Sequence, residues 1–215
     1  MNFENQLAIV IGASSRIGKK VAKTLLQQGT KVILLDNDKQ QLVLLYMQLK
    51  NDFENKVFFF EFDIDDKWQV FQFLDMVEQD FGSINNLVNC SDTLSLASIK
   101  NEAGRNKQSH FYKCTLQAIA KKMAKQKLSS IVTLETQLKN PLKQSLTKLS
   151  RELNTFGVRF NILNSSVFNA QMPVKKMIEF ENKISNTIIF LLSDKAKHIS
   201  MQSLKIDGYP EIESI

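Results

Sequence analysis

The sequence predicts an α/β fold: a doubly wound, Rossmann-type parallel sheet of about seven strands with helices on both faces. Two observations support this prediction. Short apolar runs alternate with helical patterns from end to end, and a glycine-containing turn joins the first run to the first helix. Such alternation is typical of parallel strands joined by crossover helices. With 215 residues and no linker or repeat, residues 1–215 are expected to form a single domain.

The first half of the chain alternates regularly. Leu7–Ile11 is apolar throughout, which is typical of a strand buried on both faces. The spacing of Val70, Phe73 and Val77 predicts a helix over Trp68–Phe81. The other elements expected in this half are helices at Ile17–Gln28 and Lys39–Leu49 and strands at Val32–Leu35, Val57–Phe62 and Ile84–Cys90.

In the second half, a polar stretch from Ser91 to Asn106 interrupts the alternation. Asn140 and Pro141 predict a helix start, because asparagine is a favoured N-cap and proline fits the first helical position. That helix is expected to run to Phe156. The remaining expected elements are helices at Phe111–Met123 and Ile184–Leu192 and strands at Ile131–Leu134, Val158–Leu163 and Ser203–Ile206.

Composition excludes several classes of function. The net charge is +6, but the lysines are scattered and no recognition motif accompanies them, so no nucleic-acid partner is expected. No apolar run is long enough to span a membrane. Cys90 and Cys114 are not spaced as a metal-binding pair, and Met1–Gln6 has no features of a secretory signal. We therefore expect reduced thiols, no metal and a cytoplasmic protein.

The turn Ile11–Gly18 lies where a doubly wound fold binds a pyrophosphate. Gly12 is expected to permit the tight turn, and Gly18 the close packing of helix on strand. Asp36 follows about twenty residues later, where a carboxylate binds the hydroxyls of the adenosine ribose and favours NAD. Asp36 to Asp38 also resembles a helix cap, so a purely structural role for Asp36 stays open.

These residues match the sequence motifs of a known family. The chain resembles the short-chain dehydrogenases/reductases along nearly its whole length. The family's T-G-x-x-x-G-I-G, L-V-N-N-A-G and F-L-x-S-D patterns are matched by Ile11–Gly18, Leu87–Asp92 and Phe190–Asp194, and its sixth-strand region and closing segment by Arg151–Asn161 and Ile199–Gly208. The resemblance implies a dinucleotide cofactor and a set of residues that bind it. They are Gly12, Ser14, Ser15, Arg16, Ile17, Gly18, Asp36, Asp63, Ile64, Asn89, Cys90 and Ser91.

Two departures from the family pattern affect the cofactor site. Arg16 replaces the middle glycine of the first motif. Some relatives, such as the pteridine-reductase-like ones, carry an arginine there that reaches cofactor phosphate. Arg16 thus favours NADP while Asp36 favours NAD, and we expect NAD, with NADP possible because of Arg16. Cys90, Ser91 and Asp92 replace the residues that line the nicotinamide side in the family.

The third departure concerns catalysis. Family enzymes use a serine after the fifth strand and a Y-x-x-x-K motif on the next helix. Thr136 stands at the serine position, whereas a gapless reading back from Arg151 puts Glu135 at the tyrosine and Lys139 at the lysine. Thr136 and Lys139 are thus the candidate catalytic residues. Lys139 is also read as a surface lysine before a helix cap.

The tyrosines do not fill the gap. There are three, Tyr46, Tyr112 and Tyr209. Tyr46 and Lys50 match Y-x-x-x-K literally, but on the helix after the second strand, where they are an ordinary i,i+4 pair. The family's substrate-covering segment also looks shortened to Ala170–Lys183.

Two hypotheses about function follow. In the first, the protein is a relative with degenerate or absent catalysis that binds a cofactor or serves as a scaffold. It would assemble as a homo-oligomer, dimer or tetramer, or with an active relative, as the resemblance implies for helices 111–123 and 141–156. In the second, it is an active NAD(P)-dependent oxidoreductase acting on a carbonyl or alcohol with a non-standard proton donor.

Overall fold

The computed structural model describes residues 3–61, 67–91, 117–124, 129–135, 140–165 and 173–206. They form one seven-stranded sheet in the order β3-β2-β1-β4-β5-β6-β7. All of its neighbouring strands are parallel. The strands are β1 (Leu7–Ile11), β2 (Lys31–Asp36), β3 (Val57–Glu61), β4 (Asn86–Asn89), β5 (Ser130–Glu135), β6 (Arg159–Ser165) and β7 (Ser203–Ile206). The predicted doubly wound sheet is confirmed.

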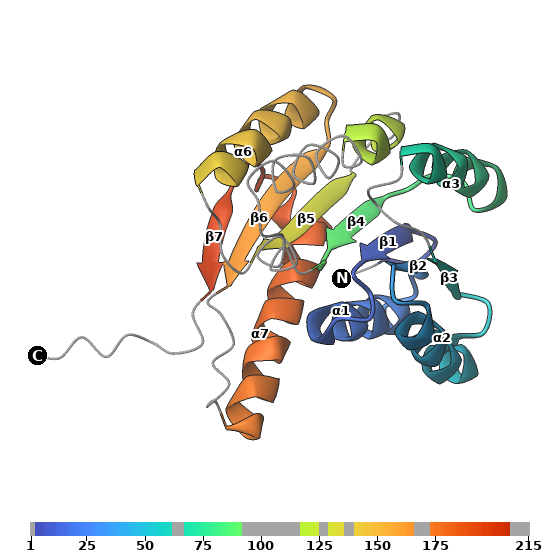
Figure 1. Ribbon diagram of the computed structural model, residues 1–215. Helices are drawn as coiled ribbons and strands as arrows, with labels where there is room; N and C mark the ends of the chain where they lie inside the picture. The colour runs from blue at the N-terminus through green and yellow to red at the C-terminus, as the bar shows by residue number, and fades with distance from the viewer. Residues whose placement is uncertain are drawn as a thin grey trace, which may run out of the picture.

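Helices cover both faces of the sheet (Figure 1). One face carries α1 (Arg16–Gln27), α2 (Lys39–Phe53) and α7 (Val174–Leu192), and the other carries α3 (Lys67–Asp80), α6 (Asn140–Thr155) and a helical segment at 117–123. A short 3-10 helix, η1 (Asp194–Ala196), follows α7. Within the described ranges, no helix is both long and apolar enough to cross a membrane.

Each face of the sheet has its own apolar core. Val10, Val88 and Val132 pack with α1 and α7, while Ile9, Leu87 and Ile131 pack with α3 and α6. This alternation follows from the pleat, which sends successive side chains to opposite faces. All five residues of β1 are buried, as its continuous apolar run predicts. The strand order reverses between β1 and β4, and in this class of fold ligands bind at that point, beyond the carboxyl ends of the strands.

The elements differ from the sequence prediction mainly at their ends. β4 is shorter than expected, and α2 continues from Leu49 to Phe53. The larger correction concerns α7, which begins at Val174 rather than at Ile184. Much of the stretch expected to be a connection is therefore helix. Its amino-terminal part is exposed and charged, so it lacks the continuous apolar pattern that marks the second half.

The carboxyl end of α7 is held by a buried arginine. Arg159 of β6 donates hydrogen bonds to the carbonyl oxygens of Leu191, Leu192, Ser193 and Ala196, at 2.5, 2.9, 3.3 and 3.2 Å. A helix leaves its last carbonyls without partners inside the helix, and the planar guanidinium supplies several donors at once. Arg159 therefore fixes α7 against the sheet.

Candidate functional site

Gly12 begins the turn between β1 and α1, at the point where the strand order reverses. Its φ is +68°, a left-handed conformation that favours glycine. A Cβ on Gly12 would lie 2.4 Å from the amide nitrogen of Ser91 and 2.5 Å from its Cα. The turn therefore packs directly on the chain that leaves β4, and a side chain at this position is excluded by the backbone.

Ser15 and Gly18 close the turn. The Ser15 hydroxyl donates to the Gly12 carbonyl oxygen at 2.7 Å and accepts from the Gly18 amide at 3.0 Å, so Ser15 is the N-cap of α1. A Cβ on Gly18 would lie 2.2 Å from the Gly12 carbonyl oxygen. The sequence suggested packing of helix on strand for Gly18. The tightest contact is instead with the turn itself.

Ser14 lies at the middle of the turn. Its hydroxyl is shielded from solvent and has no hydrogen-bond partner among the described residues. A buried hydroxyl without a partner is costly, and a phosphate oxygen would satisfy it. Together with the N-terminus of α1 behind it, this buried hydroxyl makes the turn fit a pyrophosphate group.

Asp36 ties the end of β2 to this turn. One carboxylate oxygen accepts from the Ser14 amide at 2.8 Å, and the other accepts from the amides of Asn37 and Asp38 at 2.9 and 3.3 Å. The N-cap of α2 is Asp38, whose carboxylate accepts from the Gln41 amide at 3.0 Å. The capping role that the sequence left open for Asp36 therefore belongs to Asp38. The oxygen that accepts from Ser14 retains capacity for a further donor.

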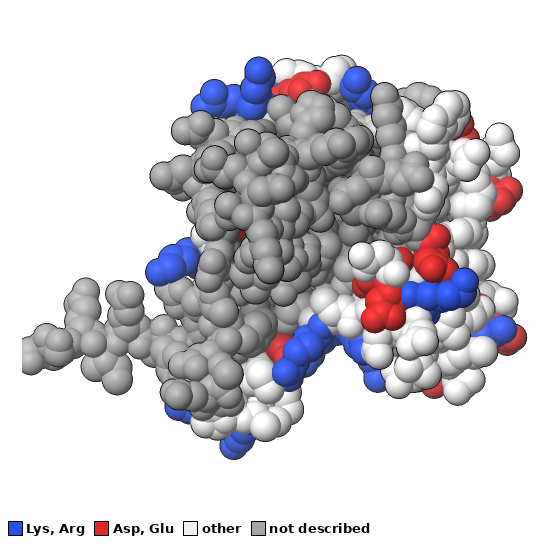
Figure 2. All heavy atoms as spheres, viewed as in Figure 1, with Lys and Arg blue, Asp and Glu red and all other residues white. Residues whose placement is uncertain are grey.

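Negative charge collects beside Asp36. Glu61 of β3 is its register partner, and Glu61 pairs with Lys39 at 2.8 Å. The hydrogen bond and the charge of Glu61 both raise the pKa of Lys39, so this cation is already committed to a carboxylate. Figure 2 shows acidic and basic side chains side by side over the corner where α2 and β3 meet. With Asp38 included, the described residues place three carboxylates and one ammonium group near the carboxyl ends of β2 and β3.

Arg16, the first residue of α1, points to a different neighbour. Its Nε lies 2.6 Å from a carboxylate oxygen of Glu181 on α7, and acidic and basic atoms meet in this region in Figure 2. The side chain of Arg16 is 58% exposed and that of Glu181 only 9%. In Figure 1, α1 lies between α2 and α7 on its face of the sheet. Arg16 thus extends toward α7, and its ion pair is with that helix.

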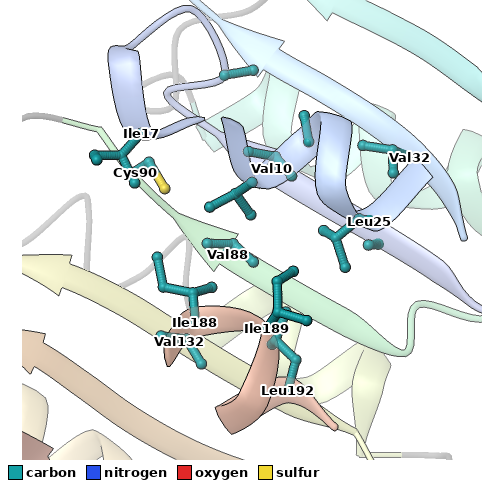
Figure 3. Packing of buried hydrophobic residues seen from close by; sticks show 14 of the residues in the cluster. Val10, Ile17, Leu25, Val32, Val88, Cys90, Val132, Ile188, Ile189 and Leu192 are labelled. Atoms are coloured by element: carbon teal, nitrogen blue, oxygen red, sulfur yellow. The ribbon is translucent and has the colours of Figure 1, made fainter. Parts of the chain in front are cut away.

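At the end of β4, the side chains of Asn89 and Ser91 lie at the site, whereas that of Cys90 lies in the core. The Asn89 side-chain oxygen accepts from the amide and the hydroxyl of Ser91 at 3.2 and 2.6 Å. The Cys90 thiol instead lies in the core near Ile17 (Figure 3), and burial raises its pKa to about 12. Ile17 and Cys90, both expected to contact the cofactor, have buried side chains and offer it only their backbone. Their contact with a cofactor stays a prediction.

Buried polar side chains mark the neighbouring end of the sheet. Thr133 and Glu135 of β5 are fully buried and lie on the face opposite Val132 and Leu134. Glu135 is the last residue of its strand and the register partner of Asn164. Thr136 and Lys139, the candidate catalytic residues, and Asp63 and Ile64, the candidate adenine contacts, lie outside the described residues.

Glu61 and Glu181 are site residues that the sequence did not predict. A signal for Glu181 existed, because Glu181, Ile184 and Ile188 have the spacing of one helix face, which places the carboxylate on a buried stripe. Nothing in the sequence pattern marks Glu61, whose role depends on pairing with β2. Among the described residues, no cluster of histidine, cysteine, aspartate and glutamate could hold a metal ion.

Comparisons with known proteins agree with this geometry. The family model described as short chain dehydrogenase matches residues 6–141. A 2,3-dihydro-2,3-dihydroxybenzoate dehydrogenase of Bacillus subtilis (strain 168) is 24% identical over 252 residues, covering 96% of each chain. The post-translational flagellin modification protein A of Campylobacter coli is 26% identical over 251 residues, covering 95% of this chain and 98% of its own.

A solved structure shows the same fold. The short-chain dehydrogenase/reductase (glucose/ribitol dehydrogenase) of Brucella melitensis superimposes with a TM-score of 0.77 at 18% identity, covering 97% of this chain and 98% of its own. The family model spans more than half of the chain, including β1, the turn, β2 and β4. This protein therefore belongs to the short-chain dehydrogenase family.

Proposed function

We propose that this protein binds NAD in preference to NADP and that its catalytic activity is degenerate or absent. The observation that carries the proposal is the turn from Gly12 to Gly18, which is closed by Ser15 and tied to Asp36. The backbone of this turn, the Ser14 hydroxyl and the N-terminus of α1 would hold the pyrophosphate. Asn89 and Ser91 would face the nicotinamide end, with Asp63 and Ile64 near the adenine. The bound cofactor would supply or accept a hydride.

The preference for NAD rests on the charges at the adenosine end. Asp36, Asp38 and Glu61 are carboxylates, and the nearby Lys39 is paired with Glu61. An added 2′-phosphate would meet these charges, whereas ribose hydroxyls would donate to Asp36. Arg16 does not offset them, because its guanidinium is bound to Glu181 on the other side of α1.

The loss of standard catalysis rests on the tyrosines. Tyr46 lies on α2, where its ring packs 4.7 Å from that of Phe59 and Lys50 lies 5.7 Å above it. This pair belongs to the α2–β3 corner rather than to the ends of β4 and β5. Tyr112 and Tyr209 lie outside the described residues. Proton transfer to a carbonyl needs an acid at the reacting atom, and the gapless reading back from Arg151 puts Glu135, not a tyrosine, at the family's position.

A protein of this kind would act by binding. We propose that it works in the cytoplasm as a cofactor-dependent scaffold, assembled as a dimer or tetramer or with an active relative. Gln117 donates to a carboxylate oxygen of Glu152 at 3.2 Å, which joins the 117–123 segment to α6. These are the two helices through which the resemblance implies association. Measurement of the molar mass in solution, alone and with active relatives, tests this part of the proposal.

The experiment for the cofactor is a titration with NADH and NADPH, followed by nicotinamide fluorescence and melting temperature. A ligand that binds only the folded state raises the melting temperature by mass action. We expect NADH to bind more tightly than NADPH. Absence of binding by either cofactor at millimolar concentration refutes the cofactor part of the proposal, and tighter binding of NADPH refutes the stated preference.

One observation favours the second candidate, an active oxidoreductase. Glu135 places a fully buried carboxyl group at the end of β5, near the position of the family's catalytic hydroxyls. A carboxyl group can donate and accept a proton at a reacting oxygen. Turnover of NADH or NAD with a panel of carbonyls and alcohols, lost in Glu135→Gln, would establish this candidate. The absence of turnover across the panel favours the first.

A further inference from the structure

We infer that Glu181 is a positioning residue that limits the affinity of the turn for the cofactor's phosphates by neutralising Arg16. This inference rests on the proposed cofactor function and extends it to a residue on α7. It starts from the Nε–carboxylate distance of 2.6 Å between these two side chains. No other arginine or lysine lies in the Gly12–Gly18 turn itself.

The ion pair joins the phosphate-binding turn to the neighbouring helix α7. Arg16 directly follows the N-cap Ser15, so its side chain starts at the N-terminus of α1, where unpaired amides and the helix dipole attract anions. Glu181 lies two turns inside α7, and its side chain is nine-tenths buried. The position of the Glu181 carboxylate is therefore fixed by burial, and the exposed guanidinium of Arg16 extends to it.

The consequence is electrostatic. A free guanidinium at this helix end would add a full positive charge to the dipole, and it would strengthen the binding of any phosphate. The paired guanidinium contributes almost no net charge. Its five donors are not all used by one carboxylate contact, so Arg16 can still donate to a phosphate oxygen, with the carboxylate opposing the attraction.

Glu181→Gln separates charge from position. Glutamine keeps the size and shape of the side chain and leaves a polar group beside Arg16 Nε, while the negative charge is removed. We expect about five- to tenfold tighter binding of ADP, NADH and NADPH alike, which is the effect of one partly screened charge near a phosphate. The ratio of NADH to NADPH affinity is expected to stay unchanged, because the ion pair of Arg16 is with α7, whereas Asp36 sets the preference at the ribose.

Salt dependence supplies a readout that a structural role would not change. Releasing one positive charge is expected to steepen the decrease of affinity with ionic strength in Glu181→Gln. Glu179→Gln is the matched control, since Glu179 is an exposed carboxylate two residues away on α7. It should leave affinity and salt dependence close to those of the original protein. In the double variant Arg16→Gln/Glu181→Gln, the gain should disappear, which identifies Arg16 as the intermediary.

The measurements are calorimetric or fluorescence titrations with ADP, NADH and NADPH at several salt concentrations, with melting temperatures taken in parallel. Tighter binding in Glu181→Gln supports the inference, even if the original protein binds too weakly to measure and the cofactor proposal fails. Equal or weaker binding in folded Glu181→Gln overturns it, whatever the original protein binds. If that variant does not fold, Glu181→Asp, which withdraws the carboxylate while keeping its charge, should bind ADP more tightly, and unchanged binding overturns the inference.

Discussion

Replacing Asp36 with asparagine tests the link between the fold and the cofactor at one residue. The Asp36 carboxylate accepts three backbone hydrogen bonds, at 2.8, 2.9 and 3.3 Å. An asparagine has only one accepting oxygen, so either the Ser14 amide or the amides of Asn37 and Asp38 must lose their partner. The losses lie at partly exposed positions, and we expect a cost of about 1–2 kcal/mol in the free energy of unfolding.

For a chain of this length, that cost corresponds to a decrease of roughly 2–8 °C in melting temperature. The same substitution removes a charge beside the ribose. We expect NADH binding to weaken about tenfold, because a charge-assisted hydrogen bond is replaced by a neutral one. NADPH binding should tighten, because a unit charge near a phosphate contributes about 1–2 kcal/mol at the effective dielectric of a protein surface.

Asp38→Asn is the matched control for this prediction. As the N-cap of α2, the Asp38 side chain accepts from the Gln41 amide, and asparagine is an equally good N-cap. This variant removes the same charge two residues away. It should keep the melting temperature and most of the NADH preference. If the two variants have the same melting temperature and the same ratio of NADH to NADPH affinity, then the assigned role of Asp36 is wrong.

Three further predictions concern the rest of the structure. Gly12→Ala should lower the free energy of unfolding by about 3 kcal/mol and abolish cofactor binding, because its Cβ would lie 2.4 Å from the Ser91 amide nitrogen. Urea unfolding measures this loss of stability, and a loss below about 1 kcal/mol would contradict the tight turn. Arg159→Met should cost about 3–5 kcal/mol by leaving the last carbonyls of α7 unpaired, whereas Arg151→Met, at an exposed position of α6, should change thermal unfolding little. Cys90 should resist thiol reagents in the folded protein at pH 8, because its thiol is buried. Burial raises the pKa of Cys90 from 9.0 to about 12, so the stability that this thiol contributes is complete below pH 9.0 and is lost as the pH rises toward 12. In Cys90→Ala, urea titrations should show a smaller decrease of stability over this pH range.

Most of the fold could be predicted from local patterns in the sequence. The continuous apolar run of β1 and the turn from Gly12 to Gly18 are short-range signals, and both predictions are confirmed in place. The amino-terminal half of α7 was missed for a physical reason. Its exposed residues Val174 and Lys175 face solvent, and buried positions begin only at Phe180, so burial could not mark its start.

The candidate site was predicted less completely, because charge pairing depends on distant segments. Asp36 and Arg16 were identified by spacing, but the partners that set their charges lie on β3 and α7. Read along the chain, Arg16 and Asp36 favour different cofactors. In three dimensions Arg16 pairs with Glu181 of α7, whereas Asp36 accepts from the amides of Ser14, Asn37 and Asp38, so the two side chains have different partners.

The same geometry separates two reasons for keeping a phosphate-binding motif. Gly12, Ser15 and Gly18 contact one another and the end of β4, so the fold requires them whether or not a cofactor binds. Retention of the glycines alone is thus weak support for binding. The Ser14 hydroxyl is different, because its burial without a described partner costs stability and serves no contact within the turn. A buried hydroxyl with no partner among the described residues, at the N-terminus of α1, is the feature that a bound phosphate would explain.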